Sequence, residues 1–182
     1  MTINKNIILI GFIGSGKSTV GKRLSKVLGW EFIDTDWEVE EITGLDIPGI
    51  FKRHGETRFR SEEVLVVKKI VSKTKVVIAT GGGTVVNQES WEALAQTGVM
   101  IHLYAPVDVI LDRVGHKKDR PLLKKDLEEV KNLWLRRQVI YQKADYTVDT
   151  SDKNIDQVVA AVLALVEEGK CLDALAEDRG SF

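Results

Sequence analysis

The fold is decided by one stretch of the chain, Gly11-Phe12-Ile13-Gly14-Ser15-Gly16-Lys17-Ser18. It matches the complete phosphate-loop pattern, in which glycines let the backbone curl around phosphate groups. The apolar run Asn6 to Ile10 precedes the loop, and apolar residues at helical spacing follow it from Lys22 to Leu28, before Gly29. This order predicts a strand, a glycine loop and a helix, which is the context that the phosphate loop requires. An ordinary glycine turn with an incidental lysine would not need that context.

The residue types in this loop suit ATP bound together with Mg²⁺. Backbone N–H groups of the loop would point at phosphate oxygens, and the helix that follows would add its positive end. Lys17 would reach the outer phosphates, and the Ser18 hydroxyl would ligate the metal ion. The loop therefore predicts ATP as a ligand and Mg²⁺ as a cofactor.

The rest of the chain alternates strand-like and helix-like segments. Further strands are predicted at Glu31–Ile33, Lys75–Thr80, Val99–Tyr104 and Tyr146–Asp149. Further helices are predicted at Trp37–Ile42, Ile47–His54, Glu56–Ser72, Glu89–Gln96, Val107–Arg113, Asp126–Lys143 and Ile155–Glu168. This alternation predicts an α/β fold with a doubly wound, five-stranded parallel sheet and flanking helices. Ligands of such sheets bind beyond the carboxyl ends of the strands.

The composition is that of a single domain spanning residues 1–182. Of the 182 residues 43% are hydrophobic and 29% are charged, and the formal net charge is -1. A near-neutral chain lacks the cationic surface that binds nucleic acid or an anionic membrane. No apolar run approaches the ~20 residues of a membrane-spanning helix. The lone cysteine, Cys171, cannot form an internal disulfide, so we expect a reduced, cytoplasmic protein. Separately, we expect a frayed tail from Gly169 to Phe182.

Two carboxylates follow the second predicted strand, in Asp34-Thr35-Asp36. Both should lie near the carboxyl edge of the sheet, beside the phosphate loop. One would serve the metal ion, and the other would orient an acceptor hydroxyl and take its proton. Either residue alone would also serve to cap the helix that begins near Trp37, and the pattern leaves this simpler role open.

Glycines and arginines further along the chain suggest a pocket for a small acidic acceptor. The bare backbone of Gly81-Gly82-Gly83 would let a ligand approach its N–H groups, unless it forms only a tight turn. Arg60 and Glu63 are three residues apart on a predicted helix, so an ion pair would aim the guanidinium. Arg136 and Arg137 lie on another helix. Arginines that converge from two helices would bind a carboxylate through paired hydrogen bonds, although any one of them is as readily a surface residue.

A basic segment between two predicted helices has the character of a lid over ATP. Residues 113–125 contain six basic residues and the single acid Asp119. Arg120, followed by Pro121, is the residue predicted to stabilise the charge on the transferring phosphoryl group. A solvated run of charge would account equally well for the lysines.

Taken in order, these motifs resemble those of the shikimate kinases over nearly the whole chain to about residue 165. The matching segments are Gly11 to Thr19, Phe32-Ile33-Asp34-Thr35-Asp36, Gly55-Glu56, Phe59-Arg60-Ser61-Glu62-Glu63, Ala79-Thr80-Gly81-Gly82-Gly83, Asp119-Arg120-Pro121-Leu122-Leu123, Arg137 with Tyr141, and Asp149-Thr150. Each piece is weak alone, but the ordered set is highly specific.

The resemblance implies ATP-dependent phosphorylation of the 3-hydroxyl of shikimate, giving 3-phosphoshikimate on the route to chorismate and the aromatic amino acids. It implies that Asp36 binds the ring hydroxyls and orients the attacking one, and that Lys17 and Arg120 stabilise the phosphoryl group. The implied substrate-binding residues are Asp36, Arg60, Glu63, Gly81, Gly82, Gly83 and Arg137. The arginines hold the carboxylate, Glu63 steers Arg60, and the glycine backbone contacts ring hydroxyls.

The resemblance also extends to the nucleotide and the metal. The implied nucleotide-binding residues are Gly14, Ser15, Gly16, Lys17, Ser18, Thr19, Arg120, Lys153 and Asn154. Ser18 would take Mg²⁺ directly, with Asp34 acting through water. A substrate-binding segment at 34–63, a moving lid within 113–125 and a monomeric state complete what the resemblance implies.

Two departures from the family pattern keep alternatives open. Val139 stands where the family often has proline, and Arg136 beside Arg137 leaves the carboxylate ligand open by one residue.

Another small-metabolite kinase, such as a gluconate kinase, is the alternative enzyme. A nucleotide- or metabolite-binding module that has lost turnover is the alternative of a different class.

Overall fold

The computed structural model describes the backbone of residues 5–114 and 127–178, and the side chains of residues 5–114 and 127–168. Within these ranges five parallel strands form one sheet, in the spatial order β2-β3-β1-β4-β5. The strands are β1 (Asn6–Ile10), β2 (Glu31–Asp34), β3 (Val76–Ala79), β4 (Gly98–Tyr104) and β5 (Tyr146–Asp149). The predicted doubly wound, five-stranded parallel sheet is confirmed.

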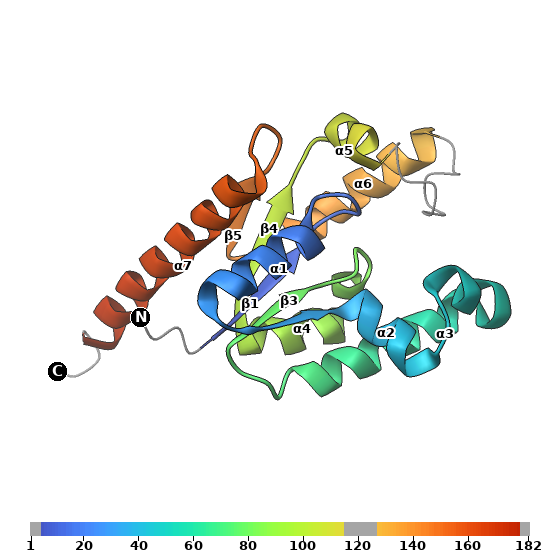
Figure 1. The fold of residues 1–182 in the computed structure, drawn as a ribbon, viewed down its shortest axis with the longest axis horizontal. Coiled ribbons are helices and arrows are strands. Elements are labelled where there is room, and N and C mark those ends of the chain that lie inside the picture. The colour runs from blue at the N-terminus through green and yellow to red at the C-terminus, as the bar shows by residue number, and fades with distance from the viewer. Residues whose placement is uncertain (1–4, 115–126, 179–182) are drawn as a thin grey trace.

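Helices cover both faces of this sheet (Figure 1). They are α1 (Lys17–Leu28), α2 (Thr35–Thr43), α3 (Ile47–Ile70), the short 3-10 helix η1 (Thr84–Val86), α4 (Gln88–Thr97), α5 (Val107–Val114), α6 (Leu127–Tyr141) and α7 (Ile155–Asp178). Successive strand residues point to opposite faces, so Ile7 and Leu9 pack with α1 and α7, whereas Ile8 and Ile10 pack with α3 to α6. Because both faces are covered, every residue of β1 and β3 is buried.

The sheet order places the site between β1 and β3. These strands are neighbours, yet the helix after β1 packs on one face and α4, which follows β3, packs on the other. Such a reversal leaves a crevice beyond the carboxyl ends of the two strands. The phosphate loop follows β1 and the triple glycine follows β3, so the topology brings these distant segments to the same edge.

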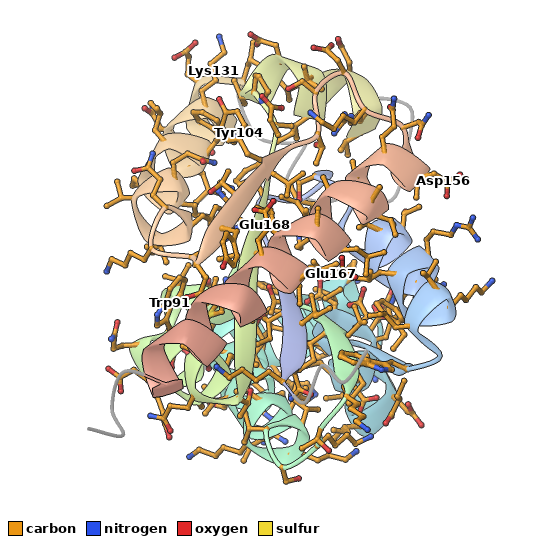
Figure 2. All side chains as sticks on the ribbon, turned by 90° about the vertical axis from the view of Figure 1, so that its left-hand side faces the viewer. Trp91, Tyr104, Lys131, Asp156, Glu167 and Glu168 are labelled. Carbon is orange, nitrogen blue, oxygen red and sulfur yellow. The ribbon has the colours of Figure 1, made fainter. Side chains whose placement is uncertain are left out.

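Helix α7 crosses one face of the sheet beside α1, with Asp156 in its first turn (Figure 2). Asp156 accepts a 2.8 Å hydrogen bond from Arg23 of α1. The sequence predicted a helix end at Glu168, but the backbone is helical to Asp178. The prediction overlooked that Leu172, Ala174 and Leu175 are strong helix formers with no proline among them. In the described ranges, no helix has the length and apolarity to cross a bilayer.

Two other boundaries differ from the sequence prediction. Helix α1 begins at Lys17 instead of Lys22, because the loop residue Gly16 is itself the N-cap. Helix α3 joins the two pieces predicted on either side of Gly55, where φ is 78° and the helix is broken by a kink. Helices α2 and α3 extend beyond the sheet on the right of Figure 1. They border the region where the sequence predicts binding of the acceptor.

Candidate active site

The phosphate loop adopts a conformation that only glycine accepts readily. Gly11, Gly14 and Gly16 have φ values of 146°, 83° and 98°, in the region that L side chains rarely enter. A Cβ at Gly11 would also lie 2.6 Å from the Leu103 carbonyl oxygen. Gly16 caps α1 without a side-chain hydrogen bond, and the buried Ser15 hydroxyl has no partner among the described residues. These groups suit phosphate oxygens, which accept hydrogen bonds at a helix N-terminus.

Lys17 and Ser18 begin α1 directly behind the loop. The Lys17 ammonium donates to the carbonyl oxygens of Gly11 and Phe12, both at 2.9 Å, so the side chain curls over the loop where phosphates would lie. The Ser18 hydroxyl donates a 2.6 Å hydrogen bond to Asp34 Oδ2. A hydroxyl beside a carboxylate is a pair of hard oxygen ligands, which fits Mg²⁺ bound to phosphates. Thr19 follows in the first turn of the same helix.

Asp34 performs the capping role that the sequence left open. Its Oδ1 accepts a 3.1 Å hydrogen bond from the backbone N–H of Asp36, and this caps α2. Because its other oxygen receives the Ser18 hydroxyl, the carboxylate joins α2 to the phosphate loop. The capping and metal-related roles are therefore compatible in one residue.

Asp36 sits in the first turn of α2 with a strongly perturbed carboxyl group. Burial raises its pKa to about 7, helped by the neighbouring carboxylates of Asp34 and Glu63 and opposed by Lys17. A carboxylate that titrates near neutral pH accepts a proton more readily than an ordinary aspartate. The environment therefore suits proton acceptance beside the phosphate loop.

The triple glycine brings three functional side chains together. A Cβ built at Gly81 would lie 3.1 Å from Asp36 Cγ, one at Gly82 would lie 2.9 Å from Arg137 Nη1, and one at Gly83 would lie 2.9 Å from Arg60 Cζ. Each glycine thus makes room for one residue that the sequence assigned to the acceptor. The side chains come from α2, α6 and α3, and they converge because positions 81–83 carry no side chain.

Arg60 is held by two glutamates of its own helix. Its Nη1 donates to Glu63 Oε2 at 2.6 Å, while Nε and Nη2 donate to Glu56 Oε1 at 3.2 and 2.9 Å. Burial acts to lower the arginine pKa, but the pairing with Glu63 outweighs it and the pKa is raised. The predicted steering of Arg60 by Glu63 thus has the matching geometry.

Arg137, and not Arg136, faces this cluster. Arg137 is 9% exposed, and its guanidinium carbon lies 5.5 Å from the centre of the Phe12 ring. Arg136 is exposed and lines a separate hollow of about 490 Å³ on the outer side of α6. One turn after Arg137, the buried Tyr141 hydroxyl donates to the Gly82 carbonyl oxygen at 2.6 Å. Burial raises the pKa of Tyr141 to about 12, so it stays a donor.

The predicted adenine-side residues make local contacts in the loop before α7. Lys153 Nζ donates to the Asp149 carbonyl oxygen at 3.0 Å, and Asn154 exchanges two 2.9 Å hydrogen bonds with Gln157 at the start of α7. Arg113, from the end of α5, donates to the carbonyl oxygens of Thr150 at 2.5 Å and Ser151 at 3.2 Å. Contacts of Lys153 and Asn154 with adenine therefore stay a prediction.

The basic segment is described only at its start. Arg113 and Val114 end α5, whereas the rest of the predicted lid, Arg120 included, lies outside the described residues. Within the described part, sequence reasoning missed Thr35 and Thr84, whose buried hydroxyls lie between the acceptor residues. Nothing in the local sequence around either threonine signals this contact.

Comparisons with known proteins point to one family. The shikimate kinase family model matches residues 13–167. The shikimate kinase of Pelotomaculum thermopropionicum is 48% identical over 166 residues, covering 90% of this chain and 96% of the relative. The solved structure of Acinetobacter baumannii shikimate kinase in complex with shikimate matches with a TM-score of 0.86 and 38% identity, over 91% of this chain and 94% of the other.

Two further structures show how far the likeness reaches. The Aquifex aeolicus shikimate kinase matches with a TM-score of 0.81 and 44% identity, over 92% of this chain and 98% of the other. A Sinorhizobium meliloti gluconokinase matches with a TM-score of 0.61 at 15% identity, over 96% of this chain and 97% of the other, which shows a shared fold and no more. The full-length matches above 30% identity and the family model together show that this chain belongs to the shikimate kinase family.

Proposed function

We propose that this protein transfers the terminal phosphoryl group of ATP to the 3-hydroxyl of shikimate, giving 3-phosphoshikimate on the route to chorismate. The observation that carries the proposal is the convergence of Asp36, Arg60 and Arg137 on Gly81–Gly83 beside the phosphate loop. Two arginines and one perturbed carboxylate suit an acceptor that has both a carboxylate and a hydroxyl.

The phosphate loop holds the nucleotide in this proposal. Its backbone N–H groups and Ser15 bind phosphate oxygens, and Lys17 moves from the loop carbonyls to the outer phosphates. When Mg²⁺ is bound, Ser18 would hold it and Asp34 would act through water. Bound there, Mg²⁺ would neutralise charge on the phosphates.

The acceptor lies between α2, α3 and α6. Arg60 and Arg137 bind its carboxylate as paired hydrogen-bond donors, which fixes the ring so that the 3-hydroxyl faces the phosphate loop. As the hydroxyl oxygen bonds to phosphorus, its proton passes to Asp36, while the bond to the ADP oxygen breaks and ADP leaves. A carboxylate with a pKa of about 7 is partly ionised at neutral pH, so it can accept that proton.

Several expectations from the sequence extend this proposal. Arg120 stabilises the transferring phosphoryl group from the lid, and Lys153 and Asn154 border the adenine. The protein acts as a monomer in the cytoplasm. Each of these stays a prediction that the kinetic and hydrodynamic properties of the protein would test.

A coupled assay of ADP release tests the function directly. The purified protein is given ATP, Mg²⁺ and one acceptor at a time from a panel that contains shikimate, quinate and gluconate, with phosphorus NMR of the product. We expect turnover with shikimate and a phosphate ester on its 3-hydroxyl. Preferred turnover of gluconate would favour the alternative kinase. Binding of ATP and shikimate without turnover would favour the non-catalytic module.

A further inference from the structure

A chain of buried hydrogen bonds runs through the acceptor side of the site. The backbone N–H of Gly81 donates to Thr35 Oγ1 at 2.7 Å, Thr35 Oγ1 lies 3.4 Å from Thr84 Oγ1, and Thr84 Oγ1 donates to Glu63 Oε1 at 2.8 Å. Thr35, Thr84 and Glu63 are only 0%, 1% and 3% exposed. The chain therefore joins the loop after β3 to α2, η1 and α3 without solvent.

The number of protons that each group can donate determines the direction of the hydrogen bonds in this series. Each threonine hydroxyl has one proton to donate. Thr84 gives its proton to the carboxylate of Glu63, so the hydrogen bond between the two hydroxyls must be donated by Thr35. Gly81 then supplies the N–H that Thr35 accepts. Every donor points toward Glu63, and a chain that ends on a charged group is reinforced along its length.

The two ends of the chain lie at the two groups that act on the acceptor. Glu63 uses its other oxygen to accept from Arg60 at 2.6 Å. At the opposite end, Gly81 lies against Asp36, since a Cβ there would be 3.1 Å from Asp36 Cγ. The same Cβ would lie 2.9 Å from Thr84 Oγ1. The threonines therefore lie between the predicted carboxylate ligand and the predicted base.

The chain also limits which backbone groups of the triple glycine can meet a substrate. Gly81 is buried, and its N–H is already committed to Thr35. The carbonyl oxygens of Gly81, Gly82 and Gly83 accept from Thr84 N, Tyr141 Oη and Val86 N at 3.2, 2.6 and 3.0 Å. Within the described residues, the N–H groups of Gly82 and Gly83 have no internal acceptor, so these two are the donors available to acceptor hydroxyls.

We propose that Thr84 and Thr35 are positioning residues that set Arg60 and the Gly81 loop for the acceptor, an inference that rests on the proposed function. Thr84 orients the Glu63 carboxylate, and Glu63 in turn orients the Arg60 guanidinium. Thr35 holds the loop so that Gly81 stays packed against Asp36. Gly81 N–H contributes to this arrangement and does not contact the substrate.

Substitutions at Thr84 separate the hydroxyl from the shape of the side chain. Thr84→Val keeps the shape and removes the hydroxyl, whereas Thr84→Ser keeps the hydroxyl. We expect Thr84→Val to raise the shikimate KM about tenfold and to leave the ATP KM unchanged, because a carboxylate that loses a buried donor no longer holds its arginine in place. Thr84→Ser should restore a KM within about twofold of the wild type.

A second variant and a spectroscopic measurement support the kinetic test. Ser90→Ala removes another buried hydroxyl, one on α4 that has no partner among the described residues, and serves as the matched control. In the protein without substrate, the Gly81 amide proton resonance should move upfield in Thr84→Val and Thr35→Val, since the hydrogen bond to Thr35 weakens or is lost. Ser90→Ala should leave both the resonance and the shikimate KM unchanged.

The outcomes distinguish this inference from the proposed function. If the wild type did not turn over shikimate, the proposed function would be wrong. The Gly81 amide proton resonance would still test whether the hydrogen-bond chain positions the loop. If the wild type turns over shikimate, an unchanged shikimate KM in Thr84→Val would overturn the inference, even if that variant has a lower melting temperature. An equal rise of the shikimate KM in Thr84→Ser and Thr84→Val would also overturn it, because that result assigns the effect to the packing of the whole side chain and not to the hydroxyl.

Discussion

The two ends of this site are built in different ways. The nucleotide end comes from the contiguous segment Gly11–Ser18, whose backbone geometry places the binding groups. The acceptor end takes Asp36, Arg60 and Arg137 from three helices and brings them onto Gly81–Gly83. The first end therefore depends on local conformation and the second on tertiary packing. A substitution at the first should affect phosphoryl transfer to any acceptor, and one at the second should separate acceptor binding from nucleotide binding.

The largest effect is expected at the nucleotide end. Lys17→Met removes the cation that we assign to the transferring phosphoryl group, so kcat should fall by about 10³-fold. Because the Lys17 ammonium donates to the loop carbonyl oxygens of Gly11 and Phe12, calorimetry should show nearly unchanged shikimate binding. If shikimate affinity fell as steeply as kcat, the two ends would not be independent.

Asp36→Asn should break catalysis from the acceptor end. We expect kcat to fall roughly 10²- to 10⁴-fold, since an amide accepts no proton in the transition state, while the ATP affinity stays unchanged. A matching loss of ATP affinity would contradict the role of Asp36 as a base.

The same carboxyl group should set the pH dependence of the wild type. A base must be ionised, and the Asp36 pKa is about 7. Below pH 7, kcat/KM should fall as the pH falls, by about tenfold per unit well below the pKa, and above pH 7 it should level off. Asp36→Asn should lose this dependence in its residual activity. A wild-type profile that is flat between pH 5 and 8 would argue against the raised pKa, on the expectation that an ordinary aspartate is fully ionised there.

A pair of neighbouring arginines sharpens the comparison further. Arg137→Lys should raise the shikimate KM by about tenfold or more, because an ammonium cannot reproduce a two-point guanidinium contact. Arg136→Lys is the matched control on the outer side of α6, and its KM should match the wild type. The opposite pattern would move the carboxylate ligand to Arg136.

The smallest effect expected is on stability. Burial raises the folded-state pKa of Asp36 from 3.8 to about 7, so the ionised carboxylate is disfavoured in the folded protein. The stability that goes with the protonated form is present below pH 3.8 and is lost as the pH rises toward 7. Asp36→Asn should therefore raise the melting temperature at pH 8, and the difference from the wild type should narrow toward pH 4. A lower melting temperature for the variant at pH 8 would contradict this sign.

The elements of the fold were largely predictable because their signals are local. The apolar runs of β1, β3 and β4 and the C-cap glycines of α1 and α2, Gly29 and Gly44, mark their boundaries without reference to the rest of the chain, whereas Gly55 marks only the kink inside α3. The extension of α7 to Asp178 was not predicted, although the segment from Leu172 to Ala176 contains strong helix formers.

The acceptor site was predictable in its members but not in its contacts. Arg137 could have been distinguished from Arg136 by helix phase, since Val130, Trp134, Arg137 and Tyr141 share one face of α6. The contact of Thr35 with Thr84 spans 49 residues, and no local pattern encodes it. The same is true of the separate partners of Gly81, Gly82 and Gly83, which only the packing of three helices determines.

The close contacts around Gly81, Gly82 and Gly83 have a consequence for inhibitors that would occupy the acceptor pocket. A single added methyl group at position 81, 82 or 83 would displace Asp36, Arg137 or Arg60 respectively. A resistance substitution that adds a side chain at one of these positions would therefore displace a group that the proposed function assigns to the substrate. An inhibitor that contacts Gly81–Gly83, and not the exposed part of Arg60, would leave few substitutions that weaken inhibitor binding and still preserve activity.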